Sequence, residues 1–260
     1  MNALTLKIGA DPEVFVRQGG KFVSAHGLVK GTKECPFPVN KGAVQVDGMA
    51  LEFNIDPAKN AKEFSDNIHT VMAILDDMVP DHELDPVPTA SFTKAYMNKQ
   101  PKEALELGCE PDFNVWTNDV NPKPNGDVNF RTGAGHIHIG WADNVDVTHP
   151  EHIEACQTVV KQLDWTLGIL STVYDKDKKR RKLYGDWGSY RVKPYGVEYR
   201  VLSNAWLKSP ELVAWVYKTV TESVQRLYKG EHLYLEDKTP CVRHIPYVNK
   251  VWGFDLPPKG

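Results

Sequence analysis

The chain of 260 residues contains only four cysteines, and no two of them form a C-x-x-C pair. This excludes a zinc knuckle or a dithiol redox motif and is typical of reduced thiols in a cytoplasm. The N-terminus has no long apolar stretch of the kind that a signal peptide needs, and no apolar run approaches membrane-spanning length. We therefore expect a cytoplasmic protein without a membrane partner.

A strong net charge and the common nucleotide-binding fingerprints are also missing. The formal net charge is -3 at pH 7, which predicts no nucleic-acid partner. The chain has neither a G-x-x-x-x-G-K-[ST] P-loop nor a dinucleotide-binding fingerprint. A nucleotide phosphate would have to be held by metal ions, by arginines or by backbone such as Gly133-Ala134-Gly135. No low-complexity linker divides the chain, so we expect a single domain over residues 1–260.

Three segments have the apolar spacing of amphipathic helices, namely 57–79, 149–174 and 210–229. The signals at their N-termini are Asp56-Pro57, the capping-box pair Thr148 and Glu151, and Ser209-Pro210. Each helix needs a sheet or another helix to cover its apolar face.

Four other segments alternate with the period of a strand, namely 9–15, 50–55, 135–141 and 196–202. In the first of them, Pro12 favours a strand start or a sheet edge. Residues 80–130 and 231–260 are expected to be loops with short elements. The pattern predicts an α+β fold, a mostly antiparallel sheet with helices packed on one face.

The polar residues of these four strands come in pairs two positions apart, which aims both side chains of a pair at the same face. The pairs are Asp11/Glu13, Glu52/Asn54, His136/His138 and Glu198/Arg200. If the strands are neighbours, the carboxylates converge and repel one another unless cations hold them. Oxygen ligands with a minority of imidazole suit magnesium or manganese better than zinc.

Each pair taken alone also has an ordinary structural explanation. An acidic pair on a strand is more often a solvated face, and Asp11-Pro12-Glu13 can be a turn. Glu198-x-Arg200 can be part of a cross-strand ion pair, and H-x-H occurs in zinc hydrolases as well as in plain strands. The common geometry of all four pairs favours a functional site over these explanations.

The segment before Glu198 is rich in arginine. Its basic run at 176–182 has a structural explanation, because lysine and arginine complement the dipole at the end of the preceding predicted helix. Arg191 and Arg200 lie among glycines and aromatic residues, where backbone can approach a ligand closely. Arginine binds phosphate or carboxylate in a fork, and phosphoryl transfer needs such groups beside metal ions.

Four motifs along the chain together resemble a known family, the phage-type (phiEco32-like) COOH–NH2 ligases. The motifs are "GADPEVF", "DGMALEFN", "RTGAGHIHIG" and "YGDWGSYRVKPYGVEYRVLSNAW". These amidoligases are distant relatives of glutamine synthetase and glutamate–cysteine ligase. The resemblance implies a curved antiparallel sheet in a glutamine synthetase-like catalytic domain. It also implies ATP-dependent joining of a carboxylate to an amine through an acyl-phosphate, with Mg²⁺ or Mn²⁺. For a phage-encoded protein, the cytoplasm would be that of the host cell.

The resemblance further implies roles for individual residues. The metal ligands would be Glu13, Asp47 and Glu52 at one ion and Asp11, His136 and Glu198 at another. The ATP contacts would be His138, Arg200 and the backbone of Gly133 and Gly135. The catalytic groups would be Arg200, Arg191 and Glu198, and the contacts to an acidic substrate would be Arg131 and Arg181. The Asp11 side chain is shorter than the glutamate usual at that place. No counterpart of the ammonia-handling part of glutamine synthetase is found, so we expect the amine to be another compound.

Two other functions remain open from the sequence. In a metal-dependent hydrolase, His136 and His138 would bind zinc and Glu198 would act as the base. Such a zinc site requires a third nitrogen or sulfur ligand, and no histidine or cysteine stands at a recognisable spacing from these two histidines. The chain could also be a non-catalytic binding module with the same fold.

Overall fold

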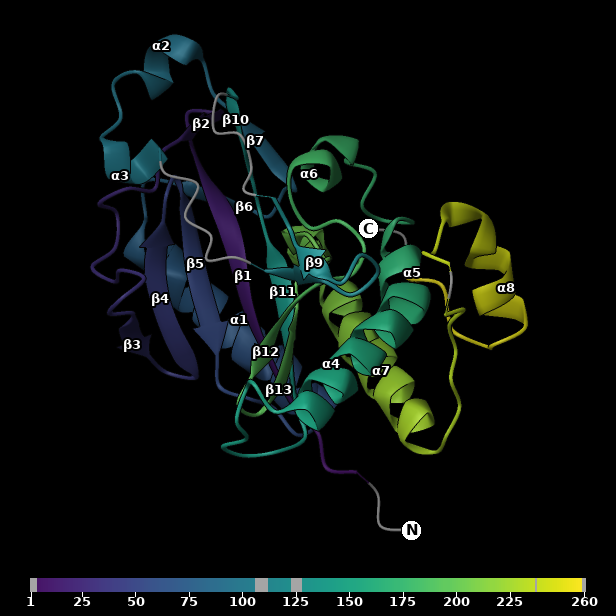
Figure 1. Ribbon diagram of the computed structural model, residues 1–260. Helices are drawn as coiled ribbons and strands as arrows, with labels where there is room; N and C mark the ends of the chain where they lie inside the picture. Colours follow the sequence, from purple (N-terminus) through teal and green to yellow (C-terminus); the bar gives the residue numbers. More distant parts are fainter. Residues whose placement is uncertain (1–3, 106–111, 123–127, 237, 259–260) are drawn as a thin grey trace.

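The computed structural model describes residues 4–105, 112–122, 128–236 and 238–258 (Figure 1). Most of its strands join one sheet of eleven strands. They are β1 (Lys7–Gln18), β2 (Lys21–Val23), β3 (Phe37–Val39), β4 (Gly42–Asp47), β5 (Ala50–Ile55), β6 (Glu83–Asp85), β8 (Phe113–Asn114), β9 (Asp119–Val120), β11 (Gly135–Gly140), β12 (Ser189–Lys193) and β13 (Gly196–Tyr199). A separate two-stranded sheet consists of β7 (Thr89–Ser91) and β10 (Phe130–Thr132).

The helices lie mostly in the second half of the chain. They are α1 (Ala61–Met78), α2 (Lys94–Met97), α3 (Lys102–Leu105), α4 (Pro150–Leu163), α5 (Ile169–Ser171), α6 (Lys178–Leu183), α7 (Pro210–Tyr228) and α8 (Ile245–Lys250). A π-helical turn, η1 (Asp164–Gly168), joins α4 to α5. Two 3-10 helices, η2 (Asn204–Lys208) and η3 (Val242–His244), complete the set.

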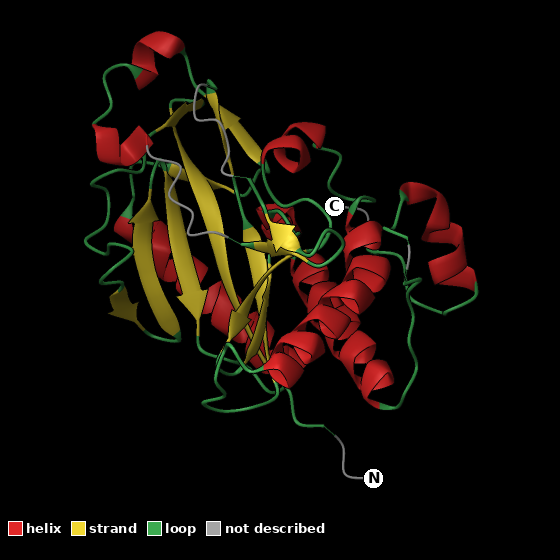
Figure 2. Cartoon of the chain, in the orientation of Figure 1, coloured by secondary structure: helices red, strands yellow, loops and turns green. Residues whose placement is uncertain are grey.

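The main sheet has the order β3-β4-β5-β1-β11-β13-β12-β8-β9, and β2 and β6 pair with the far part of β1. All strand pairs within the described residues are antiparallel (Figure 2). The long helices α1, α4 and α7 gather on one side of this sheet (Figure 1). The predicted α+β class, with an antiparallel sheet and helices on one face, is therefore confirmed.

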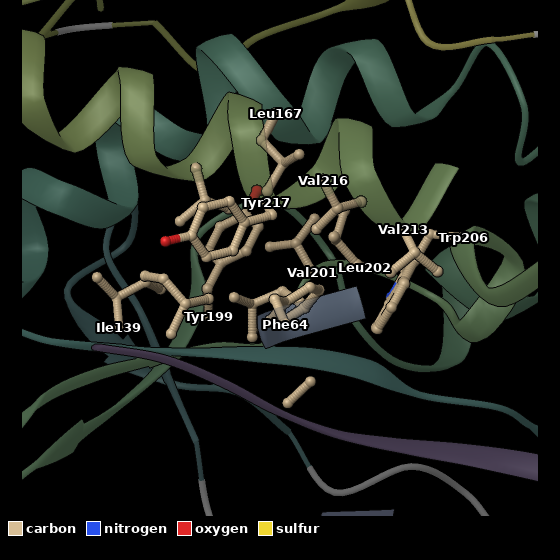
Figure 3. Close-up of a cluster of buried hydrophobic side chains, with 14 of the residues drawn as sticks. Phe64, Ile139, Leu167, Tyr199, Val201, Leu202, Trp206, Val213, Val216 and Tyr217 are labelled. Atoms are coloured by element: carbon tan, nitrogen blue, oxygen red, sulfur yellow. The ribbon is translucent and has the colours of Figure 1, made fainter. Parts of the chain in front are cut away.

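The main core lies between the sheet and these helices. Figure 3 shows its side chains between strands on one side and helices on the other, with Ile139 and Tyr199 from the sheet and Val213 and Val216 from α7. Phe64 of α1 is fully buried and stacks on Trp206 at a ring distance of 6.1 Å. Burial of these apolar faces is the main driving force that joins helices to sheet.

The three predicted helices are present, but two of them begin differently from the prediction. The side chain of Asn60, not Asp56, caps α1 by accepting from the Glu63 amide at 2.9 Å. Thr148 forms no capping box, because its amide and hydroxyl both donate to Asp146. Ser209, in contrast, caps α7 as predicted, and its side chain accepts from the Leu212 amide at 3.2 Å.

Pro12 lies inside β1, and the prediction of a strand start or a sheet edge is therefore wrong. The physical reason is the direction of the backbone amides. The Glu13 amide donates to Ala134 on the β11 side, so position 12 is directed toward β5. The recorded pairing of β1 with β5 begins only at Glu13, and the missing N–H of Pro12 therefore costs no bond there.

A second, smaller core covers the opposite face at one end of β1. It consists of Phe15, Met49, Ala50, Ala90, Phe92, Met97 and Ala104, which come from strands, from the short helices α2 and α3, and from the connections beside them. This cluster closes one end of the polar face, and the candidate site lies beside it.

None of the helices in the described part of the chain combines the length and the apolar character needed to span a membrane. Cys35, Cys156 and Cys241 are free thiols, and Cys109 lies outside the described residues. The single domain over residues 1–260 stays a prediction.

Candidate active site

The face of the sheet opposite the helices carries the predicted polar residues, and the strand register decides which of them meet. Asp11 of β1 pairs with His136 of β11, while Glu13 pairs with Glu52 of β5. On the other side of β11, His138 pairs with Glu198 of β13. The four predicted pairs therefore lie on four adjacent strands, β5, β1, β11 and β13, or directly after them. Their side chains converge on one face, as predicted.

The first cluster consists of Asp11, His136 and Glu198, which offer ligand atoms that all lie within 4.8 Å of one another. The Nδ1 atom of His136 lies 3.5 Å from Asp11 Oδ1 and 3.5 Å from Glu198 Oε1. Asp11 Oδ1 and His136 Nε2 are buried and have no hydrogen-bond partner. Buried polar atoms without partners are costly, and a cation bound among them would remove that cost.

The protonation state of this cluster suits a cation. Burial and the positive charge of Arg200 lower the pKa of His136 to about 3, so its imidazole is neutral and can act as a ligand. Burial would raise the pKa of Asp11, but His138 and His136 outweigh it and hold that pKa well below its usual range. Burial and the negative charge of Asp11 raise the pKa of Glu198.

The second cluster consists of Glu13, Asp47 and Glu52, whose ligand oxygens also lie within 4.8 Å of one another. Burial and the neighbouring Asp47 raise the pKa of Glu13 to about 7. Burial together with the other carboxylates raises the pKa of Glu52 well above its usual value. Lys33 lies at the edge of the cluster, with its Nζ 3.5 Å from Asp47 Oδ2.

Both clusters fit a divalent cation by their chemistry. Three carboxylates that repel one another form a site for a hard cation such as Mg²⁺ or Mn²⁺, as do two carboxylates with one neutral imidazole. The structure brings together the two sets of residues that the resemblance implied, although their metal-binding role remains a prediction.

Cations surround Glu198 in the first cluster. The Lys193 Nζ lies 2.9 Å from Glu198 Oε2, and Arg191 Nη1 lies 3.7 Å from Glu198 Oε1. Arg200 donates from Nη1 to Glu198 and from Nε to Asp112 Oδ2, the latter at 3.0 Å. Its guanidinium also lies over the ring of Tyr184, 5.3 Å from the centroid. The site thus places fixed positive charge beside the first cluster.

His138 lies in different surroundings from His136. Its Nε2 is 3.1 Å from Asp11 Oδ2, and its Nδ1 is 2.5 Å from the hydroxyl of Tyr195. No cluster of three metal-ligating residues in the described part of the chain contains both histidines. The two imidazoles of the H-x-H motif therefore do not form the zinc site that the hydrolase alternative requires.

Two cavities open on this face. The first has a volume of about 290 Å³, and both clusters line it together with Arg131, Tyr184, Arg191, Lys193 and Arg200. The second has a volume of about 490 Å³ and is lined by His138, Tyr195, Asn54 and Pro57, among others. Asp11 and Glu52 line both cavities, so the two meet at the carboxylates.

The glycine loop does not expose its backbone to these cavities. The amide of Gly133 donates to Pro88 O at 2.9 Å, and that of Gly135 donates to Leu202 O at 3.0 Å. These N–H groups are therefore not available to a phosphate. The Ala134 amide donates instead to Glu13 Oε2 at 2.8 Å, so the loop orients a carboxylate of the second cluster.

The two arginines predicted to contact an acidic substrate have different positions. Arg131 lines the first cavity. Arg181 does not line the described cavities, because its Nη2 donates to Ser171 Oγ at 2.9 Å and its guanidinium lies over Trp187. The neighbouring Arg180 is fully buried and donates to three backbone carbonyls, which attaches α6 to the glycine loop.

Several residues of the site were not predicted from the sequence. Lys193 could have been found, since it stands two positions after Arg191 on the same strand and shares its face. Asp112, which holds Arg200, gave a weaker signal, because only the acid-Pro-acid pattern of 110–112 marks it. Lys33, Tyr184 and Tyr195 come from loops and turns, whose positions local periodicity does not encode.

Comparison with known proteins gives a class that agrees with this chemistry. Residues 125–238 match the family described as phage phiEco32-like COOH.NH2 ligase-type 2. The resemblance seen in the motifs is thereby confirmed over this part of the chain. The matched residues include the H-x-H and E-x-R motifs, whereas the carboxylates of β1, β4 and β5 precede them.

Among solved structures, a bifunctional glutathione synthetase from Pasteurella multocida matches with a TM-score of 0.49 and 10% sequence identity. The match covers 95% of this chain and 44% of that one, so the chain spans less than half the length of that protein. No curated protein matches this chain.

Proposed function

We propose that the protein is an ATP-dependent carboxylate–amine ligase that activates its carboxylate substrate as an acyl-phosphate. The observation that carries this proposal is the position of two clusters of three metal-ligating residues beside Arg200 in one cavity. Transfer of a phosphoryl group needs positive charge on both sides of the moving group, and this arrangement can provide it.

The residues of the chain have distinct tasks in this proposal. Arg200, which is 3% exposed, is held by Asp112 and stacked on Tyr184, so its charge is oriented before substrate arrives. Arg191 and Lys193 bring further positive charge to the γ-phosphate beside Glu198. Mg²⁺ or Mn²⁺ held by the two clusters would neutralise phosphate charge. The amine then attacks the acyl carbon, and inorganic phosphate leaves as the amide forms.

The nucleotide has a natural place in the second cavity. His138 lines that cavity and contacts Asp11 of the first cluster, so phosphates that lie over the carboxylates would leave the nucleoside on the side of Tyr195, Ile55 and Pro57. Apolar and aromatic groups of this kind suit the face of a base. The first cavity is then left for the carboxylate substrate.

The catalytic test measures ADP release with Mg²⁺, ATP and a panel of amino acids and peptides, and hydroxylamine is added to trap an acyl-phosphate as a hydroxamate. We expect Arg200→Ala to lower the rate by about a thousandfold, the scale of a transition-state arginine. Glu198→Gln should also abolish most turnover. Glu154→Gln, at an exposed position of α4, is the matched control and should leave the rate unchanged. Turnover that survives in Arg200→Ala and Glu198→Gln would refute the scheme, and ATP binding without turnover would indicate a non-catalytic module.

Metal binding can be tested separately by calorimetric titration of the full chain with Mn²⁺. Glu52→Gln keeps the size of the side chain but removes one charge from the second cluster. We expect it to weaken binding of one ion by at least about tenfold, because hard cations depend on ligand charge. Glu83→Gln changes an exposed glutamate of β6 and should not alter the titration. Identical titrations of Glu52→Gln and the wild type would remove the second cluster as a metal site.

A further inference from the structure

A buried carboxylate on the helix side of the sheet has no task in the proposed chemistry. Asp164 opens the π-helical turn η1, and its side chain is fully buried. Its carbonyl accepts from the amide of Ile169, five residues along, which is the bond that characterises this wide turn. No ion pair among the described residues includes Asp164. A buried carboxylate without an ion-pair partner is costly, so its presence needs an explanation.

Two hydrogen bonds direct this carboxylate toward the sheet. Asp164 Oδ2 accepts from the indole Nε1 of Trp116 at 2.6 Å, and Oδ1 accepts from the hydroxyl of Tyr199 at 2.7 Å. Figure 3 shows Tyr199 on the helix side of the sheet, within the main core. Burial raises the pKa of Asp164 to about 7, while the two hydrogen bonds favour the ionised form, which accepts from both donors. Asp164 therefore ties the helix layer to β13 and to the turn after β8.

The turn η1 also leaves room for the Tyr199 hydroxyl. Gly168 is its last residue, and a Cβ at that position would lie 2.5 Å from the hydroxyl oxygen. One end of the turn thus accepts the hydroxyl proton, and the other end has no side chain that would push the hydroxyl away. The position of this one hydroxyl is therefore fixed from both ends of η1.

Tyr199 lies directly before Arg200 in the chain. Because side chains alternate along an extended chain, the Tyr199 ring points into the core while the Arg200 side chain points to the polar face. The Arg200 amide donates to Ser189 O at 3.0 Å, so the pairing with the β12 side continues past the end of β13. A shift of the Tyr199 ring would therefore move the backbone from which the guanidinium projects.

Trp116 belongs to the segment that holds the guanidinium itself. It lies four residues after Asp112, whose Oδ2 accepts from Arg200 Nε at 3.0 Å. Between them, the Asn114 side chain accepts from the Trp116 amide at 2.9 Å, which closes the turn after β8. Asp164 thus holds one end of a short segment whose other end holds Arg200.

We propose that Asp164 is a positioning residue for Arg200. It fixes Tyr199, and with it the backbone of the arginine. It also fixes Trp116, and with it the segment that carries Asp112. The expected effect on turnover rests on the proposed function, in which Arg200 stabilises the transferring phosphoryl group, and a misplacement of about 1 Å can cost about a hundredfold in rate. The effect on the position of Arg200 does not depend on that function.

The first test measures the hydrogen bond of Arg200 directly, by ¹H–¹⁵N NMR of the full chain without ATP, at a pH above 7. The Arg200 Nε–H donates to Asp112 inside the protein, so it should exchange slowly with water, and its signal is identified by its loss in Arg200→Lys. Asp164→Asn keeps the size of the side chain but replaces one acceptor oxygen by an NH2 group. We expect the Arg200 Nε–H to exchange at least about tenfold faster in this variant, the scale of one lost hydrogen bond.

Two further variants each remove one donor and leave the other bond in place. They are Tyr199→Phe and Trp116→Phe, and both should raise the exchange rate less than Asp164→Asn does. They also test the proposal if Asp164→Asn does not fold, which circular dichroism and thermal unfolding show.

The matched control is Thr166→Val, which removes a buried hydroxyl from the same turn without changing its size. Thr166 is fully buried in η1, but its Oγ1 bonds to Ser223 Oγ of α7 at 2.7 Å and makes no bond to the sheet. This variant should lower the unfolding free energy and leave the exchange at Arg200 Nε–H unchanged.

Turnover then separates positioning from a merely structural role. With ADP release as the readout, Asp164→Asn should lower kcat by about 10- to 100-fold and leave the KM for ATP nearly unchanged, because Arg200 acts on the transition state. In an Arg200→Ala background, Asp164→Asn should cause no further loss, since the group that it positions is gone.

Three results would overturn the proposal. They are a wild-type exchange rate at Arg200 Nε–H in folded Asp164→Asn, an equal rise of that rate in Thr166→Val, and losses of turnover that add in full when Asp164→Asn and Arg200→Ala are combined. Faster exchange in Asp164→Asn of a protein without ATP turnover would sustain the positioning role and refute only the proposed function.

Discussion

The carboxylates of the site show how burial and neighbours divide one residue type into two states. Asp11 is surrounded by His136 and His138, and its pKa is held well below the usual range. Glu13 and Glu52 are surrounded by other carboxylates, and their pKa values are raised. The second cluster therefore holds protons near neutral pH that a cation must displace, whereas Asp11 is already ionised.

This difference predicts that the effect of Glu13 on the stability of the fold changes with pH in opposite directions with and without bound metal. The pKa of Glu13 is raised from 4.5 to about 7, so between these values the folded state binds more protons than the unfolded state. When a chelator keeps metal ions away, the protonated Glu13 side chain stabilises the folded state at low pH, and this stabilisation is lost as the pH rises through 7. Mg²⁺ binds the ionised form, so its stabilising effect should grow over the same range.

Thermal unfolding at pH 5.5, 6.5 and 7.5, in EDTA and in Mg²⁺, measures both effects. Other buried groups titrate as well, including Asp164, whose pKa burial raises to about 7. The Glu13→Gln variant isolates the effect of Glu13. Its profile in EDTA should be flatter than that of the wild type, and its gain from Mg²⁺ should be smaller. Superimposable profiles would contradict the assignment.

At the scale of elements, the glycine loop before β11 acts as a structural joint between three parts of the chain. Gly133 O accepts from Arg180 of α6, and Gly135 O accepts from the indole of Trp206 in η2. Between them, the Ala134 amide holds the Glu13 carboxylate. Small residues are needed because the backbones approach closely, so the pattern that suggested a phosphate loop reflects packing beneath the Glu13 carboxylate.

This joint predicts that Gly135→Ala is strongly destabilising. A Cβ at Gly135 would lie 2.3 Å from Ser203 O and 2.5 Å from Trp206 Nε1, and neither atom belongs to a flexible side chain. We expect the unfolding free energy to fall by about 2–4 kcal/mol, as for overpacking of a buried site. At Gly9, also in a strand, the nearest atom to a Cβ would be His138 Cβ at 3.5 Å, an ordinary contact. Gly9→Ala is the control in urea unfolding, and equal losses in both variants would disprove the steric argument.

At the scale of the whole molecule, one apolar core supports the entire polar face. Strands β11 and β13 contribute Ile137, Ile139, Val197 and Tyr199 to the core, and they contribute His136 and Glu198 of the first cluster to the opposite side. Helices α1, α4 and α7 cover that core, so the positions of the ligands depend on helix packing behind the sheet.

Substitution of Phe64 tests whether the site depends on this helix packing. It is fully buried in α1 and packs against Trp206 and Tyr217. Phe64→Ala should lower the unfolding free energy by about 3–5 kcal/mol, because it removes apolar contacts and leaves a cavity. Tyr228→Ala, at a position of α7 that is 55% exposed, should have little effect in the same denaturant titration. A loss below about 1 kcal/mol for Phe64→Ala would show that α1 is not part of the cooperative core.

The sequence by itself determined which side chains share a face. The period of two along 50–55, 135–141 and 196–202 separated core residues from the polar pairs, and the period of helices located α1, α4 and α7. These patterns are local, since they depend only on the geometry of one strand or one helix. For that reason the fold class and the membership of the polar face followed from the chain alone.

Only the tertiary structure decided which of those residues meet. It placed β1 between β5 and β11, so that Glu13 meets Glu52 and Asp11 meets His136. It also turned Arg181 toward Ser171 and away from the cavities, and it enclosed the glycine loop. Strand order and loop position depend on burial and pairing between segments far apart in the sequence, and no local period contains that information.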